Sequence, residues 1–398
     1  MPTHPKRSHP LARLLHYGRN YRSKIRQATL YSILNKVFDL APPALIGTAV
    51  DVVVKPQDSL IARLGIEDVF NQLLILTALS VIIWGLESIF EYAYEYLWRN
   101  LAQNIQHDLR LDAYSHIQDL ELAYFEERST GSLLAILNDD INQLERFLDV
   151  GANELLQVLT TVIVIGTAFF VLTPAIAWMT ILPIPLILWG SVAFQNFLAP
   201  RYADVREKVS SLSSLLSNNL SGIMTIKSFT TEKYEIERLR VESEAYRQSN
   251  RKAIKLSAAF IPLIRVVILA SFCAILLFGG MQVARGQLAV GTYSVLVFLT
   301  QRLLWPLTRL GQTLDLYQRA MASTNRVMDL LDTPIVIHSG DRALPFGQVR
   351  GEIDLNNVSF AYQEGYPILK NLSLHIAAQK KIAIVGTTGS GKSTLVKL

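Results

Sequence analysis

The residues best suited to chemistry lie near the end of this 398-residue chain. In order they are Gly386, Thr387, Thr388, Gly389, Ser390, Gly391, Lys392, Ser393 and Thr394. This is the G-x-x-x-x-G-K-S pattern of a phosphate-binding loop, whose glycine-rich backbone directs N–H groups at phosphate oxygens. Lys392 can reach the β- and γ-phosphates of a nucleotide, and the Ser393 hydroxyl can ligate Mg²⁺. An apolar strand is predicted at 382–385 and a helix after the loop, a setting that disfavours a chance glycine-rich turn.

The composition indicates a membrane protein. Hydrophobic residues make up 50% of the chain, which is high for a soluble domain. Residues 1–30 contain seven Lys or Arg and no Asp or Glu. Beside an apolar span this charge marks the cytoplasmic side, whereas a nucleic-acid-binding arm is the disfavoured alternative. The single cysteine, Cys273, can form neither an internal disulfide nor a metal cluster.

Six apolar segments are predicted to span the membrane. Their approximate bounds are 28–54, 73–97, 155–173, 175–197, 256–281 and 293–317. Pro42 and Pro43 predict a bend in the first span, because proline cannot donate an interior helical hydrogen bond. An even number of spans places both chain ends on one side, and a P-loop that uses cytosolic ATP places that side in the cytoplasm.

Helical sequence continues beyond the membrane in two places. The segment from Leu73 to about Leu122 has roughly 50 helical residues, which reach about 75 Å, whereas the hydrocarbon core is about 30 Å thick. Two helical hairpins, 91–150 and 201–255, are therefore predicted to project into the cytoplasm. Residues 1–27 predict an amphipathic helix on the membrane surface, with Arg13 and Arg19 toward lipid phosphates.

Several separate motifs resemble those of one family, the ATP-binding cassette (ABC) exporters of the half-transporter type, similar to lipid flippases and multidrug exporters. They lie at 124–134 with 138–140, at 222–229 with Glu232, and at 286–292, 322–327 and 358–362. The resemblance covers nearly the whole chain. It implies a mainly α membrane protein with a six-helix exporter transmembrane domain and long cytosolic helical extensions. The first strands of an α/β P-loop ATPase domain are then expected to follow.

The resemblance also implies domain boundaries and further site residues. We expect a cytosolic N-terminus at 1–27, a transmembrane domain at 28–332, a linker at 333–350 and the N-terminal part of a nucleotide-binding domain at 351–398. Tyr362 resembles the aromatic residue that stacks on adenine, with a tyrosine of the protein core as the alternative. The implied cofactors are ATP and Mg²⁺. Short coupling helices near 117–126 and 222–229 are expected to press on the nucleotide domains of a dimer.

Some motifs of the family are not assigned in this chain. The family's glutamine loop, signature sequence, Walker B Asp with its catalytic Glu, and switch His all follow the P-loop, and no catalytic residue is assigned here. His375 precedes the P-loop strand and is not a switch His. We therefore expect a fragment or truncated product of such a transporter, truncated after the Walker A motif and inactive in hydrolysis by itself.

Charged residues inside the predicted spans indicate a candidate substrate cavity, because such residues usually face a polar interior. They are Glu87, Glu91, Arg265, Arg302 and Arg309, with Asp39 in the first span and Glu95 continuing the acidic face of the second. The functional interpretation is a partly basic cavity for an amphipathic or anionic substrate. The structural alternative is that Glu–Arg pairs fix the packing of the helices.

The function predicted from the sequence is that of a subunit of an ATP-driven exporter moving a lipid, peptide or amphipathic drug-like substrate. It is expected to work as a homodimer or heterodimer, in contact with membrane lipid and without nucleic acid. Its expected location is a bacterial inner membrane, with the N-terminus and the ATP-binding domain in the cytoplasm. A truncated subunit that regulates a partner or has no function is the alternative, and a membrane-anchored P-loop kinase or GTPase is disfavoured.

Overall fold

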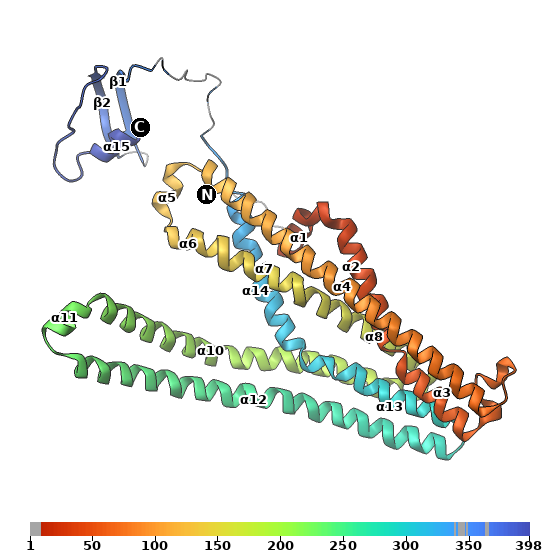
Figure 1. The fold of residues 1–398 in the computed structure, drawn as a ribbon. Helices are drawn as coiled ribbons and strands as arrows, with labels where there is room; N and C mark the ends of the chain where they lie inside the picture. The colour runs from red at the N-terminus through yellow and green to blue at the C-terminus, as the bar shows by residue number, and fades with distance from the viewer. Residues whose placement is uncertain (1–8, 338–339, 341–346, 348, 363–365) are drawn as a thin grey trace. The chain divides into compact units, whose positions relative to one another are not determined.

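The computed structural model describes residues 9–337, 340, 347, 349–362 and 366–398, apart from the side chain of residue 127. The chain forms two compact units, Met1–Pro334 and Ile335–Leu398 (Figure 1). Residues 338–339, 341–346 and 348 of the predicted linker lie outside the described part.

Helices alone make up the regular structure described in the first unit. They are α1 (Pro10–Tyr17), α2 (Arg22–Asp39), α3 (Pro42–Val54), α4 (Val69–Asp119), α5 (Leu122–Glu127), α6 (Thr130–Ala135), α7 (Ile141–Arg146), α8 (Ala152–Leu172), α9 (Pro174–Ile181), α10 (Pro183–Ser221), α11 (Ile223–Ser228), α12 (Glu232–Ala284), α13 (Val290–Leu304) and α14 (Leu310–Leu331). Two π-helical turns, Ile136–Asp140 and Phe147–Gly151, flank α7.

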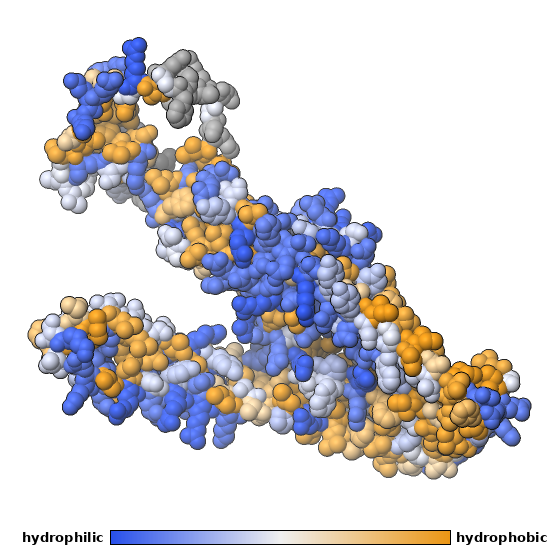
Figure 2. Space-filling view, viewed as in Figure 1, coloured by the Kyte–Doolittle hydropathy of each residue, from blue (hydrophilic) through white to orange (hydrophobic). Residues whose placement is uncertain are grey.

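Five helical stretches in the described residues are long and apolar enough to cross a membrane. They are Pro10–Val54, Val69–Asp119, Thr130–Leu172, Pro174–Ser221 and Glu232–Ala284. Figure 2 shows hydrophobic side chains gathered around α3 and the adjoining ends of α4 and α12. These features make the chain an integral membrane protein of mainly α structure.

Proline interrupts two of the predicted spans. In the first span, α2 ends at Asp39 and α3 begins at Pro42, the position where a missing N–H is tolerated best. In the predicted sixth span, a 3₁₀ turn at Pro306–Thr308 separates α13, which has 15 residues, from α14. This segment is not among the five long apolar stretches, so the sixth span stays a prediction.

The long helices predicted to leave the membrane are continuous. α4 has 51 residues and α12 has 53, which correspond to about 75–80 Å each. The Asp68 carboxylate caps the start of α4 by accepting a hydrogen bond from the Asn71 N–H, 3.0 Å away. α10 and α12 pack side by side as a long hairpin with the short helix α11 at its tip (Figure 1).

Glycines bring α3 and α13 into backbone contact. A Cβ atom at Gly47 would lie 2.6 Å from the Gly291 carbonyl oxygen, and one at Gly291 would meet the Gly47 carbonyl. One turn further along α3, Asp51 Oδ1 accepts a hydrogen bond of 2.7 Å from the Gly291 N–H, at the start of α13. Small residues allow this close crossing, which is a common way of packing membrane helices.

The described residues of the second unit form two antiparallel strands and one helix. β1 (Ile353–Ala361) pairs with β2 (Pro367–Ile376), so that Asp354 lies opposite His375, and α15 follows at Lys392–Lys397. The prediction of a strand at 382–385 was wrong for this structure, because these residues have no regular secondary structure and pair with neither described strand. Ile382, Ile384 and Val385 are exposed, and a strand is stable only when its backbone groups find a partner.

Candidate nucleotide-binding site

The turn at 386–391 has a backbone that requires glycine at two positions. Gly389 and Gly391 have φ angles of 88° and 83°, in the left-handed region that other residues rarely adopt. Gly391 is also close to β2, because a Cβ there would lie 3.1 Å from Ile368 Cγ2 and 3.2 Å from Leu369 Cδ2. Conformation and space together therefore disfavour a side chain at Gly391.

Lys392 folds back over this turn. Its ammonium group donates hydrogen bonds to the carbonyl oxygens of Gly386 and Thr387, at 2.9 and 2.8 Å. The first helical residue of α15 is Lys392 itself, as the sequence predicts, and the Ser393 side chain that follows is exposed. The loop therefore presents a cation and a hydroxyl together, a combination that suits a phosphate group and its magnesium ion.

Tyr362 lies beside the start of α15. Its hydroxyl donates to Thr394 Oγ1 at 3.4 Å, and its ring meets Phe360 edge-to-face with a centroid distance of 5.0 Å. Thr394 is buried, whereas Tyr362 is about half exposed. The structure therefore brings Tyr362 together with the loop and leaves part of its ring open for a base to stack.

Some of the predicted intramembrane charges form ion pairs, and others are exposed without an ion-pair partner among the described residues. Arg302 donates to Asp39 Oδ1 at 2.5 Å, and Lys36 donates to the other oxygen of Asp39 at 2.7 Å. Glu87 lies near enough to Asp39 and Arg302 to interact with their charges. The pairing partner of Arg302 is thus Asp39 on α2, not one of the glutamates on α4.

The remaining predicted cavity residues are exposed in the first unit. The Arg265 guanidinium lies 5.6 Å from the Trp305 ring centroid, in a cation–π arrangement. Glu91 and Arg309 are also exposed, and no ion pair joins either of them to another described residue. The arrangement leaves the side chains of Arg265 and Arg309 exposed, whereas Arg302 is paired.

Sequence reasoning missed a charge cluster that joins the first hairpin to α14. Arg326 donates to both oxygens of Asp140, at 2.5 and 2.8 Å, and Ser323 donates to Asp140 Oδ1 at 2.8 Å. The hydrogen bond to Asp140 raises the pKa of Arg326 above its ordinary value. Both partners lie in motifs of the family, but nothing in the sequence indicates that these motifs meet.

The expected orientation of Arg13 was wrong. Instead of facing lipid, its side chain is only 12% exposed and donates to Asp329 at 2.8 Å and to Asp332 at 2.7 Å. Two tyrosines hold the same region to α4: Tyr17 donates to Asp112 at 2.5 Å and Tyr21 to Asp108 at 2.6 Å.

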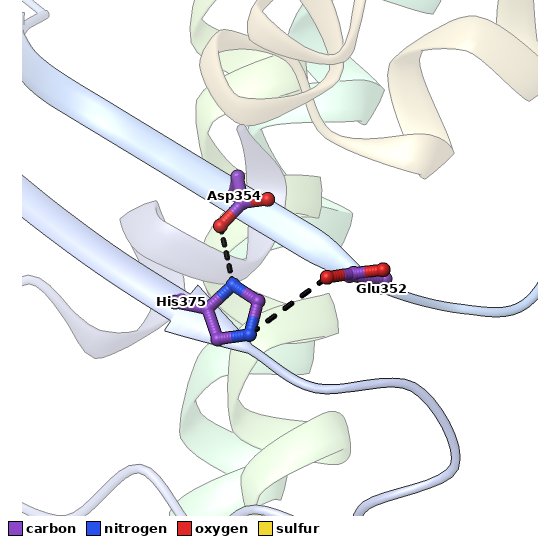
Figure 3. A group of neighbouring side chains, drawn as sticks. All are labelled: Glu352, Asp354 and His375. Atoms are coloured by element: carbon purple, nitrogen blue, oxygen red, sulfur yellow. Dashed lines mark hydrogen bonds and ion pairs between the residues drawn. The ribbon is translucent and has the colours of Figure 1, made fainter.

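A second cluster missed by the sequence lies on the strands of the second unit (Figure 3). Asp354 Oδ1 is 2.5 Å from His375 Nδ1, and Glu352 Oε1 is 3.8 Å from His375 Nε2. One ring nitrogen and one oxygen of each carboxylate lie within 4.8 Å of one another, but all three residues are exposed and each ring nitrogen already has a carboxylate partner. This arrangement suits a protonated imidazole better than a metal, and the bond to Asp354 raises the pKa of His375.

Comparison with known proteins identifies both parts of the chain. Residues 26–307 match the model of the ABC transporter transmembrane region, and residues 369–398 match the ABC transporter model. The chain is 26% identical over 82% of its length to the uncharacterized ABC transporter ATP-binding protein YwjA of Bacillus subtilis, covering 57% of that protein.

Two relatives have names that describe what they transport. The chain is 27% identical over 75% of its length to the ATP-dependent lipid A-core flippase of Syntrophus aciditrophicus, covering 49% of it. It is also 27% identical over 81% of its length to the fatty acid ABC transporter ATP-binding/permease protein of Mycobacterium tuberculosis, covering 51%. The chain thus spans between about half and three-fifths of the length of such relatives. Because the transmembrane model matches well over half of the residues, this chain belongs to the ABC transporter family.

Proposed function

We propose that this chain is a subunit of an ATP-driven ABC exporter. The observation that carries the proposal is the loop at 386–394, where the Lys392 ammonium, the Ser393 hydroxyl and Tyr362 gather on one unit. The described part of the same chain also carries five helical stretches that are long and apolar enough to cross a membrane. The names of the relatives agree with export of lipid or other amphipathic molecules.

The residues present fit ATP and Mg²⁺. Lys392 would hold the β- and γ-phosphates, loop N–H groups would bind the phosphate oxygens, and Ser393 would ligate the metal. Tyr362 would stack on the adenine ring through its exposed face. Bound Mg²⁺ would neutralise phosphate charge, and the residues of this chain would position the nucleotide.

The test of nucleotide binding is the substitution Lys392→Ala in the full-length protein, with Lys381→Ala as the control because Lys381 is an exposed lysine outside the loop. Charge-assisted hydrogen bonds contribute about 1.5–3 kcal/mol, so we expect K392A to weaken ATP binding by about 10- to 100-fold. Fluorescence titration with a trinitrophenyl ATP analogue measures the affinity. Unchanged binding in K392A would overturn the assignment. Binding without hydrolysis by the full-length protein would instead support a regulatory or non-functional subunit.

The proposed substrate is an amphipathic molecule with an anionic head, including lipids. Arg265 and Arg309 expose cationic groups, and Arg302, although paired with Asp39, keeps about half of its side chain exposed. We propose that two such subunits, identical or different, enclose these residues as a dimer. The proposed location is a bacterial inner membrane with the loop in the cytoplasm.

Transport is tested by ATP-dependent uptake of fluorescent lipids into inverted vesicles, comparing an anionic lipid with a zwitterionic one. The expected result is preferential uptake of the anionic lipid, reduced by Arg309→Gln without loss of ATP binding. Equal reduction for both lipids would show that Arg309 acts on helix packing, as in the structural alternative.

A further inference from the structure

The outward face of α2 changes from cationic to apolar along one side of the helix. Arg22 and Arg26 are four residues apart and therefore share a face, and both are exposed. Further along the same face, Leu30 and Val37 are 53% and 41% exposed. One helical turn, about 6 Å along the axis, separates Arg26 from Leu30. This short transition is the pattern expected where a helix passes from lipid headgroups into hydrocarbon.

The opposite face of α2 packs against α4, which fixes the direction of the cationic face. Trp98 on α4 donates to Ser32 Oγ at 3.0 Å, and Asn35 donates to the Glu87 carbonyl at 3.0 Å. Ser32 and Asn35 are both buried. Arg22 and Arg26 therefore point away from the helix partner that could otherwise have supplied carboxylates.

The acidic groups that face this region from neighbouring helices already bind other side chains. On α4, Asp108 accepts from Tyr21 and Asp112 from Tyr17. On α14, Asp329 and Asp332 accept from Arg13. In the described part of the chain, no ion pair joins an acidic residue to Arg22 or Arg26. The same holds for Arg19 and for Lys24, which are also exposed. Lys24 lies toward the opposite side of the helix, two residues from each arginine, where it covers the Tyr21 ring at 5.8 Å.

We propose that Arg22 and Arg26, with Arg19 one turn before them, bind the headgroup phosphates of anionic phospholipids in the leaflet at the N-terminal side, while Lys24 adds positive charge to the same segment. The lipid source is favoured because the cations continue directly into an exposed apolar surface on the same side of the helix. Clusters of at least four Lys or Arg at the end of a membrane helix are the pattern of anionic-lipid recognition. This site lies outside the candidate substrate cavity and does not depend on transport activity.

The test measures binding of a fluorescent phosphatidylglycerol to the full-length protein in detergent solution by fluorescence anisotropy, with a matched fluorescent phosphatidylcholine for comparison. The variant is Arg22→Gln with Arg26→Gln. The control, Lys233→Gln with Arg240→Gln, removes the same charge from α12 near the tip of its hairpin. We expect the control to retain the preference for phosphatidylglycerol. In the α2 variant, each arginine removed should lower the ratio of the phosphatidylglycerol affinity to the phosphatidylcholine affinity about fivefold.

Two further arms separate lipid binding from a packing defect and from the binding of soluble anions. Arg22→Lys with Arg26→Lys keeps the charge and should restore most of the preference, which a packing defect would not allow. Inorganic phosphate added in solution should not displace the lipid, whereas displacement would indicate a site for soluble anions and overturn the proposal. Equal affinity of the α2 variant and the native protein for phosphatidylglycerol would also overturn it.

Discussion

Several charged side chains in the described part of this chain are paired with residues far away in the sequence. Arg302 reaches Asp39 across 263 positions, and Arg13 reaches Asp329 across 316. His375 shows the same principle at shorter range, because its cross-strand neighbour Asp354 lies against Nδ1. The effect of this contact on the pKa of His375 can be measured directly, because a histidine titrates within the pH range of ordinary solution experiments.

We expect the pKa of His375 to lie above its ordinary value of about 6.5. Because the folded-state pKa is raised, the stabilisation is fully present below the ordinary pKa and is lost as pH rises through the raised value. The pH dependence of diethylpyrocarbonate modification, read at His375 by peptide mass spectrometry, measures this pKa. Asp354→Asn should lower it more than Glu352→Gln, because the contact with Glu352 is longer. A normal pKa in the unsubstituted protein would contradict the contact.

The contact between the first hairpin and α14 depends on Asp140, whose side chain is only 9% exposed. In the Arg326→Ala variant the Asp140 carboxylate keeps the hydrogen bond from the Ser323 hydroxyl but loses the two hydrogen bonds from the guanidinium. Because Arg326 is itself about half exposed, water screens the pair, and we expect a loss of about 1–2 kcal/mol of stability. Thermal unfolding in detergent measures the change. Arg319→Ala, which breaks the exposed pair with Asp315 on the same helix, should cost under about 1 kcal/mol. Equal shifts in both variants would refute the special role of Asp140.

At the scale of elements, the crossing of α3 and α13 is a helix contact that depends on glycine. An alanine methyl at Gly47 would meet a backbone carbonyl, which cannot rotate away as a side chain can. We expect Gly47→Ala to lower stability by about 1–3 kcal/mol or more. Gly166→Ala on α8 is the control, because its Cβ would meet no atom within 4 Å. The melting temperatures of the two variants, measured in the same detergent, give the comparison. A native-like melting temperature for G47A would show that the helices are not in contact.

The sequence was most informative where structure depends on neighbouring residues. The P-loop could be predicted because its glycines, lysine and serine are contiguous, and the long α4 because no breaker follows Gly85. It was least informative where distant segments meet. No local sequence pattern predicts the Asp140–Arg326 pair or the position of the Arg13 side chain. The strand predicted at 382–385 failed for a related reason, since apolar residues favour a strand but cannot form one without a neighbour.

At the scale of the whole molecule, the tip of the α10–α12 hairpin exposes large apolar side chains. Met224 is 78% exposed and Phe229 is 71% exposed. Exposed apolar groups gathered at one place usually mark a contact with another surface. This agrees with the expectation that α11 is a coupling helix that contacts a nucleotide-binding domain, an expectation that transport measurements can test.

We therefore expect Met224→Ser with Phe229→Ser to reduce ATP-dependent uptake into inverted vesicles at least severalfold, while ATP affinity stays unchanged. The reason is that a polar tip loses apolar contact area without altering the nucleotide loop. Val209→Ser, a partly exposed site on α10 away from the tip, is the control. If uptake and ATP affinity both remain native in the double variant, the tip has no coupling role.

The bonds from Arg13 to Asp329 and Asp332 also set the order of events during biosynthesis. At about 5–20 residues per second, a ribosome needs roughly 16–64 s to extend the chain from Arg13 to Asp332. During that interval α1 has emerged but its aspartate partners do not exist. The bonds from Arg13 on α1 to these aspartates can therefore form only after the α14 segment has been synthesised. The contact of α1 with α14 is thus a late step, whereas Tyr17 of α1 can bind Asp112 on α4 earlier.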